Sequence, residues 1–195
     1  MKKTVLTVLF SSLLGSSLLA NECSDKLKYN FTFFGAADKS YVVTKNTFKT
    51  ATSNFPEGKL LNATLDIDAL SIDTSADLSN GKGKWPEPMV NIRNMNVVNN
   101  FFKQFETDIG KVSTKIVKIQ DSVIDVEFKM NGVTKIIPFS YKIEDGIIKA
   151  NGKLDILDFN TTKAWTRFSA VCKSFHHGKS WSELDIFFEV PENCK

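Results

Sequence analysis

Hydrophobic and polar residues alternate with a period of two through much of the chain. The alternation is most regular over residues 124–156, where the pairs Asn131-Gly132 and Asp145-Gly146 separate three runs. A period of two is typical of a β-strand with one apolar face, and Asn-Gly or Asp-Gly between two such runs is a strong hairpin signal. These residues therefore predict a β-meander.

The same alternation recurs in further runs on both sides of the meander. In each run the apolar residues share one side of a strand, and the runs cover residues 27–33, 41–51, 61–69, 111–119 and 184–190. Together with the meander they give about eight strands, enough to close a barrel or to fill a sandwich.

Two segments follow a helical spacing instead. Apolar residues at i, i+3, i+4 and i+7 predict an amphipathic helix over residues 98–105, and a second helix that begins at Asn160 or Thr161 and ends at Gly178. The apolar stripe of the second helix consists of Trp165, Phe168, Cys172 and Phe175. The Gly-, Pro- and Ser-rich stretch 75–88 predicts a loop.

The first 20 residues have the layout of a secretory signal peptide. Lys2 and Lys3 precede an apolar run that leads to small residues and Ala20, and the segment is too short and too rich in serine for a membrane span. We therefore expect removal of residues 1–20 and an exported mature chain, 21–195, that forms one domain.

The whole chain has 25 basic against 22 acidic residues, and loss of two lysines brings these closer to balance. We expect no nucleic-acid partner, because that would need a clustered basic face.

Few residues are suited to catalysis or metal binding. His176 and His177 are the only histidines, and the sequence has no nucleophile-elbow, P-loop or HExxH motif. We therefore expect no enzyme, no catalytic residues and no cofactor. A metal site built on Cys172, His176 and His177 is left as an alternative, although a fourth ligand is not evident. Asn160 begins an Asn-x-Thr glycosylation pattern, for which a helix cap is the favoured interpretation.

Four segments of the chain carry recognisable motifs: LLNATLDIDALSIDTS (60–75), IRNMNVVNNFFKQF (92–105), MNGVTKIIPFSYKI (130–143) and DFNTTKAWTRFSAVCKSFHHGKSWSELDIFF (158–188). These segments resemble motifs of the YceI-like family, whose members are exported lipid- and polyisoprenoid-binding proteins. The segments occur in the order of the family, and the resemblance covers nearly the whole mature chain.

The resemblance implies an all-β fold with minor α: an eight-stranded antiparallel, lipocalin-like barrel with one or two short helices at its ends. It also implies a periplasmic or secreted bacterial protein that carries or sequesters an isoprenoid or other long-chain lipid in its apolar lumen. No stable membrane span is expected after signal cleavage, and a homodimer is left open. The alternatives are a filled barrel that serves as a non-lipid interaction module, which shows the same alternation, and the metal protein described above.

Inward-facing apolar side chains are the expected lipid-binding residues. Those predicted for the lumen are Phe31, Phe33, Leu65, Ile67, Phe128, Phe139, Tyr141, Leu154, Ile186 and Phe188. Those predicted for a lid at the mouth of the lumen are Val98, Phe101, Phe102 and Phe105. The alternative is that these four residues plug the end of the barrel.

Cys23, Cys172 and Cys194 all lie in the mature chain. Export brings the chain into an oxidising compartment, so one disulfide and one free thiol are expected. In a closed antiparallel barrel the first and last strands pair, which brings Cys23, just before the first strand, close to Cys194, just after the last. We therefore predict a Cys23–Cys194 disulfide with Cys172 reduced. A bond between Cys172 and Cys194 is the alternative.

Overall fold

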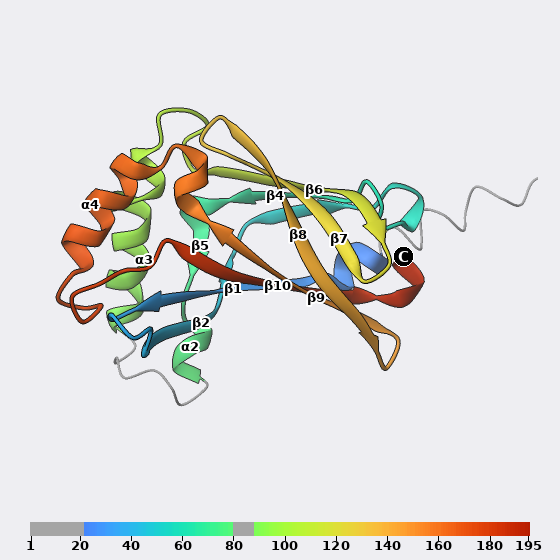
Figure 1. The fold of residues 1–195 in the computed structure, drawn as a ribbon, viewed down its shortest axis with the longest axis horizontal. Coiled ribbons are helices and arrows are strands. Elements are labelled where there is room, and N and C mark those ends of the chain that lie inside the picture. The colour runs from blue at the N-terminus through green and yellow to red at the C-terminus, as the bar shows by residue number, and fades with distance from the viewer. Residues whose placement is uncertain (1–21, 80–87) are drawn as a thin grey trace, which may run out of the picture.

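A curled antiparallel sheet of ten strands forms most of the molecule (Figure 1), in a computed structural model that describes residues 22–79 and 88–195. The strand order is β3-β4-β6-β7-β8-β9-β10-β1-β2-β5. The strands are β1 (Lys28–Gly35), β2 (Tyr41–Phe48), β3 (Ala51–Asn54), β4 (Thr64–Asp68), β5 (Ile72–Asp73), β6 (Lys111–Gln120), β7 (Val123–Met130), β8 (Val133–Glu144), β9 (Ile147–Asp155) and β10 (Glu183–Pro191).

Most helical segments lie between the strands, apart from a helical turn over residues 22–26 before β1 and a 3-10 turn after β10. They are α2 (Ala76–Ser79), α3 (Pro88–Asn100), α4 (Thr162–Cys172) and the 3-10 turns η1 (Pro56–Gly58), η2 (Ala69–Ser71), η3 (Phe102–Gln104), η4 (Ile156–Phe159) and η5 (Glu192–Cys194). The predicted signal peptide, residues 1–20, and residues 80–87 of the predicted loop lie outside the described residues. No helix within the described ranges is long and apolar enough to cross a membrane.

The predicted meander is confirmed as β7, β8 and β9. Met130 pairs with Val133 on β8 across Asn131-Gly132, and β8 pairs in the same way with β9 across Asp145-Gly146. All four turn residues have positive φ, between 49° and 75°. A two-residue turn of this kind matches the right-handed twist of the strands that it joins, and Asn, Asp and Gly tolerate that conformation best.

The expected number of eight strands is wrong, because two of the predicted runs are each interrupted. The run that starts at Tyr41 breaks between β2 and β3, and the run over 61–69 breaks after β4, where the Asp68 side chain accepts a hydrogen bond from the Leu70 amide and turns the chain into η2. The strands on the two sides of these breaks still pair, β2 with β5 and β3 with β4. Because β2 leads into β3 and β4 leads into β5, these two pairings bring the ends of the sheet together, so it curls into a barrel.

Pro138 lies within β8, which has β7 on one side and β9 on the other. It is opposite Asp125 on β7, but the pairing with β9 begins only at Phe139, opposite Gly152. Proline has no N–H to donate to a ladder, so it is tolerated where a strand has no partner on one side. Its position explains why the pairing of β8 with β9 stops where it does.

The helix predicted over residues 98–105 is wrong in its extent. α3 ends at Asn100, Phe101 leaves the helical region with φ −122° and ψ −73°, and the chain continues as the turn η3. The helix instead reaches back to Pro88, into the stretch expected to be a loop. Proline suits the first turn of a helix, where a missing N–H breaks no helical hydrogen bond.

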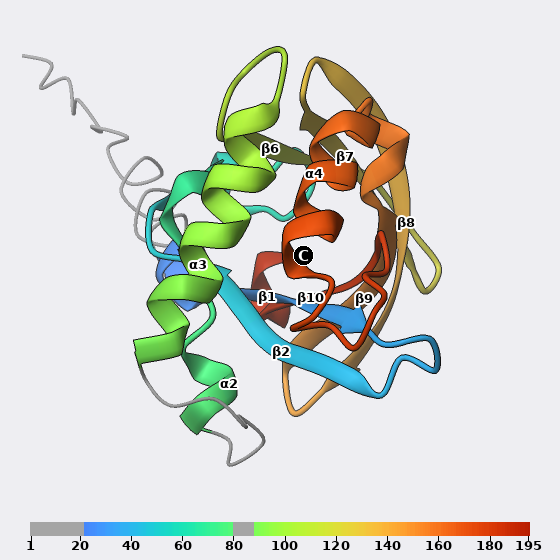
Figure 2. The same ribbon diagram turned by 90° about the vertical axis from the view of Figure 1, so that its left-hand side faces the viewer.

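The second predicted helix is confirmed as α4, with a shorter extent than expected. It ends at Cys172, and turns occupy residues 173–178. The Thr161 hydroxyl donates to the carbonyl of Ile156 (2.6 Å) and does not cap the helix. α3 and α4 pack against each other and lie across one end of the barrel (Figure 2), whereas the C-terminus lies at the other end.

The predicted Cys23–Cys194 disulfide is present, with a Cα–Cα distance of 6.0 Å, and Cys172 is a free, buried thiol. The bond joins the segment before β1 to the segment after β10, and these two strands pair along the sheet from Lys28 opposite Glu189. The disulfide therefore lies at the end of the barrel opposite α3 and α4 (Figure 1).

Removal of this disulfide should destabilise the protein strongly. The bond closes a loop of 171 residues, for which the chain-entropy model gives about 5 kcal/mol, and native disulfides of exported domains usually contribute roughly 2–5 kcal/mol. We expect the double variant Cys23→Ser/Cys194→Ser to lose unfolding free energy in that range, as measured by urea denaturation. Cys172→Ala, which leaves the bond intact, is the control. Peptide mapping of the unreduced protein that found Cys172 in a linked pair would contradict this assignment.

Candidate functional site

The barrel encloses an apolar cavity of about 230 Å³. A single buried water needs roughly 10–15 Å³, so this space is many times larger than a packing defect. Nine of the ten side chains predicted for the lumen lie on its wall: Phe31, Phe33, Leu65, Ile67, Phe128, Phe139, Leu154, Ile186 and Phe188. The alternation along the strands thus identifies the residues of the wall, and their role in lipid binding stays a prediction.

Tyr141 is the one predicted lumen residue that does not line the cavity. Its hydroxyl donates to the carbonyl of Asp121 (2.7 Å) and accepts from the ammonium group of Lys195 (2.6 Å). Tyr141 follows Phe139 on the same face of β8, but it lies one step further along the strand, opposite Ala150. The cavity ends before that level, so the correct face did not suffice to place Tyr141 on the wall.

The cavity extends along the barrel between its two ends. At the helix-covered end the wall includes Trp165 of α4 and Ile92 of α3, and Ile92 is 38% exposed, so the wall reaches the surface there. Towards the disulfide the wall includes Leu60, which is only 2% exposed and whose amide donates to the Cys194 carbonyl. The cavity is therefore open beside α3 and closed near the disulfide.

Three phenylalanine rings, from β7, β8 and β10, form part of the wall. Phe139 stacks on Phe128 with ring centroids 6.1 Å apart and tilts against Phe188 at 5.6 Å. Phe139 also lies directly over Gly152 of β9, where an added Cβ would come within 2.6 Å of the ring. Gly152 therefore allows the ring to lie close to the sheet and leaves the centre of the barrel free.

The residues predicted as a lid form an aromatic cluster beside α4. Phe101, Phe102 and Phe105 are all buried, with ring centroids 5.1–5.6 Å apart, and Phe101 also contacts Phe168 at 6.3 Å. Phe101 and Phe102 lie on the cavity wall, whereas Phe105 and Val98 do not. The first two are positioned to contact a ligand, and the other two support the cluster from outside.

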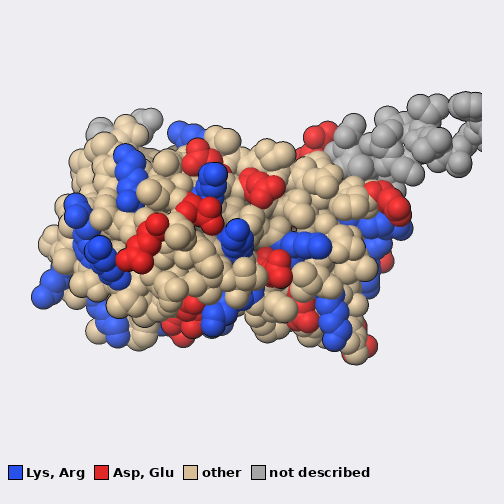
Figure 3. Space-filling view, turned by 90° about the horizontal axis from the view of Figure 1, so that it is seen from above, with Lys and Arg blue, Asp and Glu red and all other residues tan. Residues whose placement is uncertain are grey.

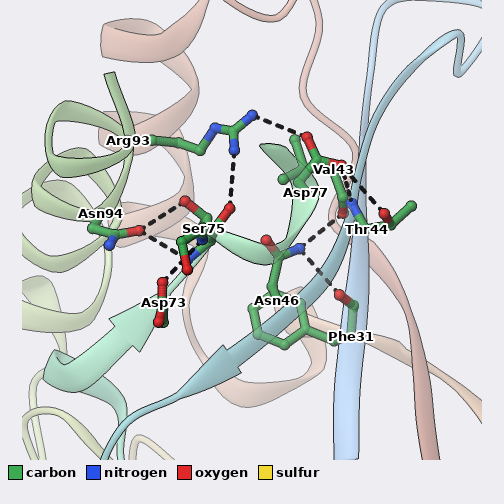
Figure 4. Close-up of polar contacts among 10 residues, drawn as sticks. Phe31, Val43, Thr44, Asn46, Asp73, Ser75, Asp77, Arg93 and Asn94 are labelled. Carbon is green, nitrogen blue, oxygen red and sulfur yellow. Dashed lines mark hydrogen bonds and ion pairs between the residues drawn. The ribbon is translucent and has the colours of Figure 1, made fainter. Parts of the chain in front are cut away.

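A buried polar network crosses from α3 to β2 next to the cavity (Figure 4). The Arg93 guanidinium lies 3.4 Å from the Asp77 carboxylate and donates to the carbonyl of Thr74 (3.3 Å), and the side chains of Arg93 and Asp77 are only 14% and 3% exposed. Asp77 also accepts hydrogen bonds from the amide and hydroxyl of Thr44. Because buried charges are stable only when paired, this network fixes α2 and α3 against β2.

Asn46 and Arg93 also line the cavity wall, and the apolar pattern of the sequence does not predict them because both are polar. Asn46 is 1% exposed, and its amide nitrogen donates to the carbonyls of Phe31 (3.0 Å) and Val43 (2.8 Å). The sequence signal for Asn46 is its position two residues before Phe48, on the inward face of β2.

His176 lies on the cavity wall, packed between aromatic rings. Its ring is 4.8 Å from that of Phe33 and 5.0 Å from that of Tyr41, and its Nδ1 is 2.7 Å from the hydroxyl of Ser180. Burial lowers the pKa of His176 to about 4, with smaller contributions from the positive charges of Arg93 and His177. The imidazole is therefore neutral near pH 7 and adds no charge to the cavity.

The alternative metal site is not assembled in this structure. His176 is buried, His177 is exposed, and burial raises the pKa of the Cys172 thiol to about 11. A protonated thiol is a poor nucleophile and a poor metal ligand. Over residues 22–79 and 88–195, no three His, Cys, Asp or Glu side chains are grouped closely enough to hold a metal ion.

The buried His176 should make the protein less stable in acid. Between pH 6.5, the ordinary pKa, and about pH 4, the pKa in the fold, the unfolded state binds more protons, so the unfolding free energy falls as the pH falls through this window. A fall of the pKa from 6.5 in the unfolded state to about 4 in the fold corresponds to a loss of about 3 kcal/mol of unfolding free energy across this window. We expect His176→Phe to lose this part of the pH dependence in urea titrations at pH 4–7, and His177→Gln to keep it. Equal pH slopes for wild type and His176→Phe would contradict the prediction.

Comparison with known proteins gives a structural match without a sequence match. No protein-family model and no curated protein matches the sequence. The fold is similar to that of a polyisoprenoid-binding domain from Saccharophagus degradans implicated in plant cell wall breakdown, with a TM-score of 0.54 and 10% identity over 86% of this chain and 97% of that chain. A second solved structure, BcnA of Burkholderia cenocepacia, gives a TM-score of 0.48 and 15% identity over 83% of this chain and 94% of that chain.

At 10% identity the first match concerns the fold and not the ligand. The shared architecture is nevertheless the one that the sequence motifs imply, and the match spans nearly the whole of the other domain. The fold of the chain is therefore similar to that of this domain, and it is the barrel that the resemblance of the four sequence segments implies.

Proposed function

We propose that the protein is an exported carrier or sequestering protein that binds an isoprenoid or other long-chain lipid in its barrel. The observation that carries this proposal is the cavity of about 230 Å³ inside the barrel, whose wall consists mostly of aliphatic and aromatic side chains. An apolar chain gains about 0.8 kcal/mol for each CH₂ group that it buries. A long chain can therefore bind tightly in this cavity without a fixed charge.

The cavity favours lipid binding over the two alternative functions. A filled interaction module would bring inward side chains from opposite strands into contact, and Phe31, Leu65 and Ile186 instead border open space. A metal protein or enzyme would require Cys172 to act as a thiolate, which the raised pKa of its thiol opposes. We infer a binding function without a cofactor.

The proposed export to a bacterial periplasm or to the medium agrees with the disulfide. Stable structural disulfides are rare in reducing cytosol and common in exported domains. The Cys23–Cys194 bond is buried at both cysteines and joins the two ends of the described chain. Such a bond suits a domain that folds and works in an oxidising compartment.

The distribution of charge also agrees with an apolar ligand. Figure 3 shows lysine and arginine side chains interspersed with aspartate and glutamate over the face seen from above. A nucleic-acid site would require basic side chains gathered in a patch or stripe. On the face shown, the surface therefore favours a lipid over a nucleic acid as the partner.

A bulky side chain placed inside the barrel should abolish lipid binding. Thr114 of β6 lies on the cavity wall, and a phenylalanine there would fill the space that the lipid chain occupies. Ser113, the preceding residue, points to the opposite face of the strand, so Ser113→Phe is a matched control. We expect lipid extracted from protein purified from its own host to fall at least about tenfold in Thr114→Phe, since each lost CH₂ contact weakens binding several-fold.

Mass spectrometry of the extracted lipids decides the result. Wild type and Ser113→Phe should carry the same long-chain lipid, and urea denaturation should show that Thr114→Phe is folded, because the added ring enters existing space. Wild type with no more lipid than an unrelated protein of similar size would refute the proposal. The same conclusion would follow if folded Thr114→Phe retained the full amount of lipid.

A further inference from the structure

One buried hydrogen-bond acceptor on the cavity wall has no partner. Among the described residues, the buried side-chain polar atoms without a hydrogen bond are Asn46 Oδ1 and Ser169 Oγ. Ser169 does not line the cavity, whereas Asn46 does. Buried acceptors without a partner are rare in proteins and destabilise the fold, so Asn46 Oδ1 requires an explanation.

The orientation of the Asn46 amide is fixed by its surroundings. Its nitrogen donates to the carbonyls of both Phe31 and Val43, and a flipped amide would place its oxygen against those two acceptors. The oxygen therefore points away from both carbonyls. In Figure 4 it lies on the side of the Asn46 side chain that faces α3 and the Arg93 network.

A purely structural role accounts for the nitrogen of Asn46 but not for its oxygen. The register of β1 and β2 shifts between Phe31 and Phe33, and Lys45 has a φ of 55°, so the ladder is irregular beside Asn46. The amide nitrogen satisfies carbonyls that this irregularity frees. The oxygen accepts no hydrogen bond from the ladder or from any other described residue.

The charges around Asn46 indicate that this donor is neutral. Among the described residues of the cavity wall, Arg93 is the only charged one, and its guanidinium is already paired with the Asp77 carboxylate and the Thr74 carbonyl. His176 is uncharged near pH 7, because its pKa is lowered to about 4 by burial. In the part of the wall that the structure describes, the polar end of the cavity therefore has no unpaired positive charge for a phosphate or carboxylate head group, and Asn46 Oδ1 is its one buried acceptor without a partner.

We propose that Asn46 Oδ1 accepts a hydrogen bond from the neutral hydroxyl head group of the bound lipid, so that the preferred ligand is an isoprenoid alcohol or another long-chain alcohol. This inference rests on the proposed lipid-binding function and makes its ligand more specific. The head group lies beside α3, where the cavity reaches the surface at Ile92, and the chain extends along Phe128 towards Leu60. Oδ1 has almost no exposed surface in the empty cavity, so the hydroxyl reaches it as neighbouring wall side chains adjust.

A series of three ligands with the same chain tests the inference without changing the protein. Geranylgeraniol has the hydroxyl, its methyl ether lacks the donor, and geranylgeranyl diphosphate carries negative charge. By native mass spectrometry or displacement of a fluorescent apolar probe, we expect the alcohol to bind roughly tenfold tighter than the ether, the effect of one buried hydrogen bond. The diphosphate should bind more weakly than the alcohol.

A variant of Asn46 shows whether this residue is the cause of the preference. In Asn46→Leu the alcohol and the ether should bind with equal affinity, since the acceptor is gone. Thr114→Val removes a hydroxyl from a different strand of the same wall and should preserve the tenfold preference. The ratio of the two affinities cancels any general weakening of binding, as in a double-mutant cycle.

The outcomes separate this inference from the proposed function. Equal binding of alcohol and ether to the wild type would refute the role of Asn46 and leave lipid binding intact, whereas binding of none of the three ligands would count against both. Tightest binding of the diphosphate would overturn the neutral head group and assign Arg93 to an anion. If Asn46→Leu does not fold, the three ligands on the wild type still decide the preference.

Discussion

Two bent segments of the chain, β2 with β3 and β4 with β5, pair with each other and close the barrel. The other features of the molecule depend on that closure. At the bend the Lys49 amide donates to the carbonyl of Ser71 (3.0 Å), and the Asp68 amide donates to the carbonyl of Thr50 (3.0 Å), so hydrogen bonds continue across the interruption. A closed sheet has no free edge, and all of its inward side chains face one another across a fixed diameter. An interior of this kind is filled only if the side chains are long enough, and here they leave a cavity.

The two ends of the barrel are held by different kinds of interaction. Near the termini, the disulfide holds the chain covalently, and the buried Leu60 side chain packs beside it. At the other end, Phe101, just after α3, contacts Trp165 of α4 with ring centroids 6.4 Å apart, and the buried pair of Arg93 and Asp77 joins α3 to α2. The second kind of contact separates at a much lower cost in free energy than a covalent bond, so entry of a ligand is expected beside the helices.

Much of the fold and most of the cavity wall follow from the sequence, because a period of two decides which face of a strand points inward. The Asn131-Gly132 and Asp145-Gly146 turns fix the register of the meander in the same local way. The period of two does not reveal where a strand breaks, as at Asp68, because it shows only which face a residue occupies and not the hydrogen bond from the Leu70 amide to the Asp68 side chain. The depth of Tyr141 along the barrel was missed for a different reason, since it depends on a partner distant in the sequence, and Asn46 was missed because a polar residue does not enter an apolar pattern.

The contact between Phe139 and Gly152 links the backbone of one strand to the shape of the cavity. A Cβ at position 152 would lie 2.6 Å from the Phe139 ring, so any side chain there would force this wall residue to shift. Position 152 on β9 therefore constrains the shape of the cavity, whereas the polar wall residues Asn46 and Arg93 lie on β2 and α3. The shape and the polarity of the cavity are thus set on separate elements of the fold and can change by separate single substitutions.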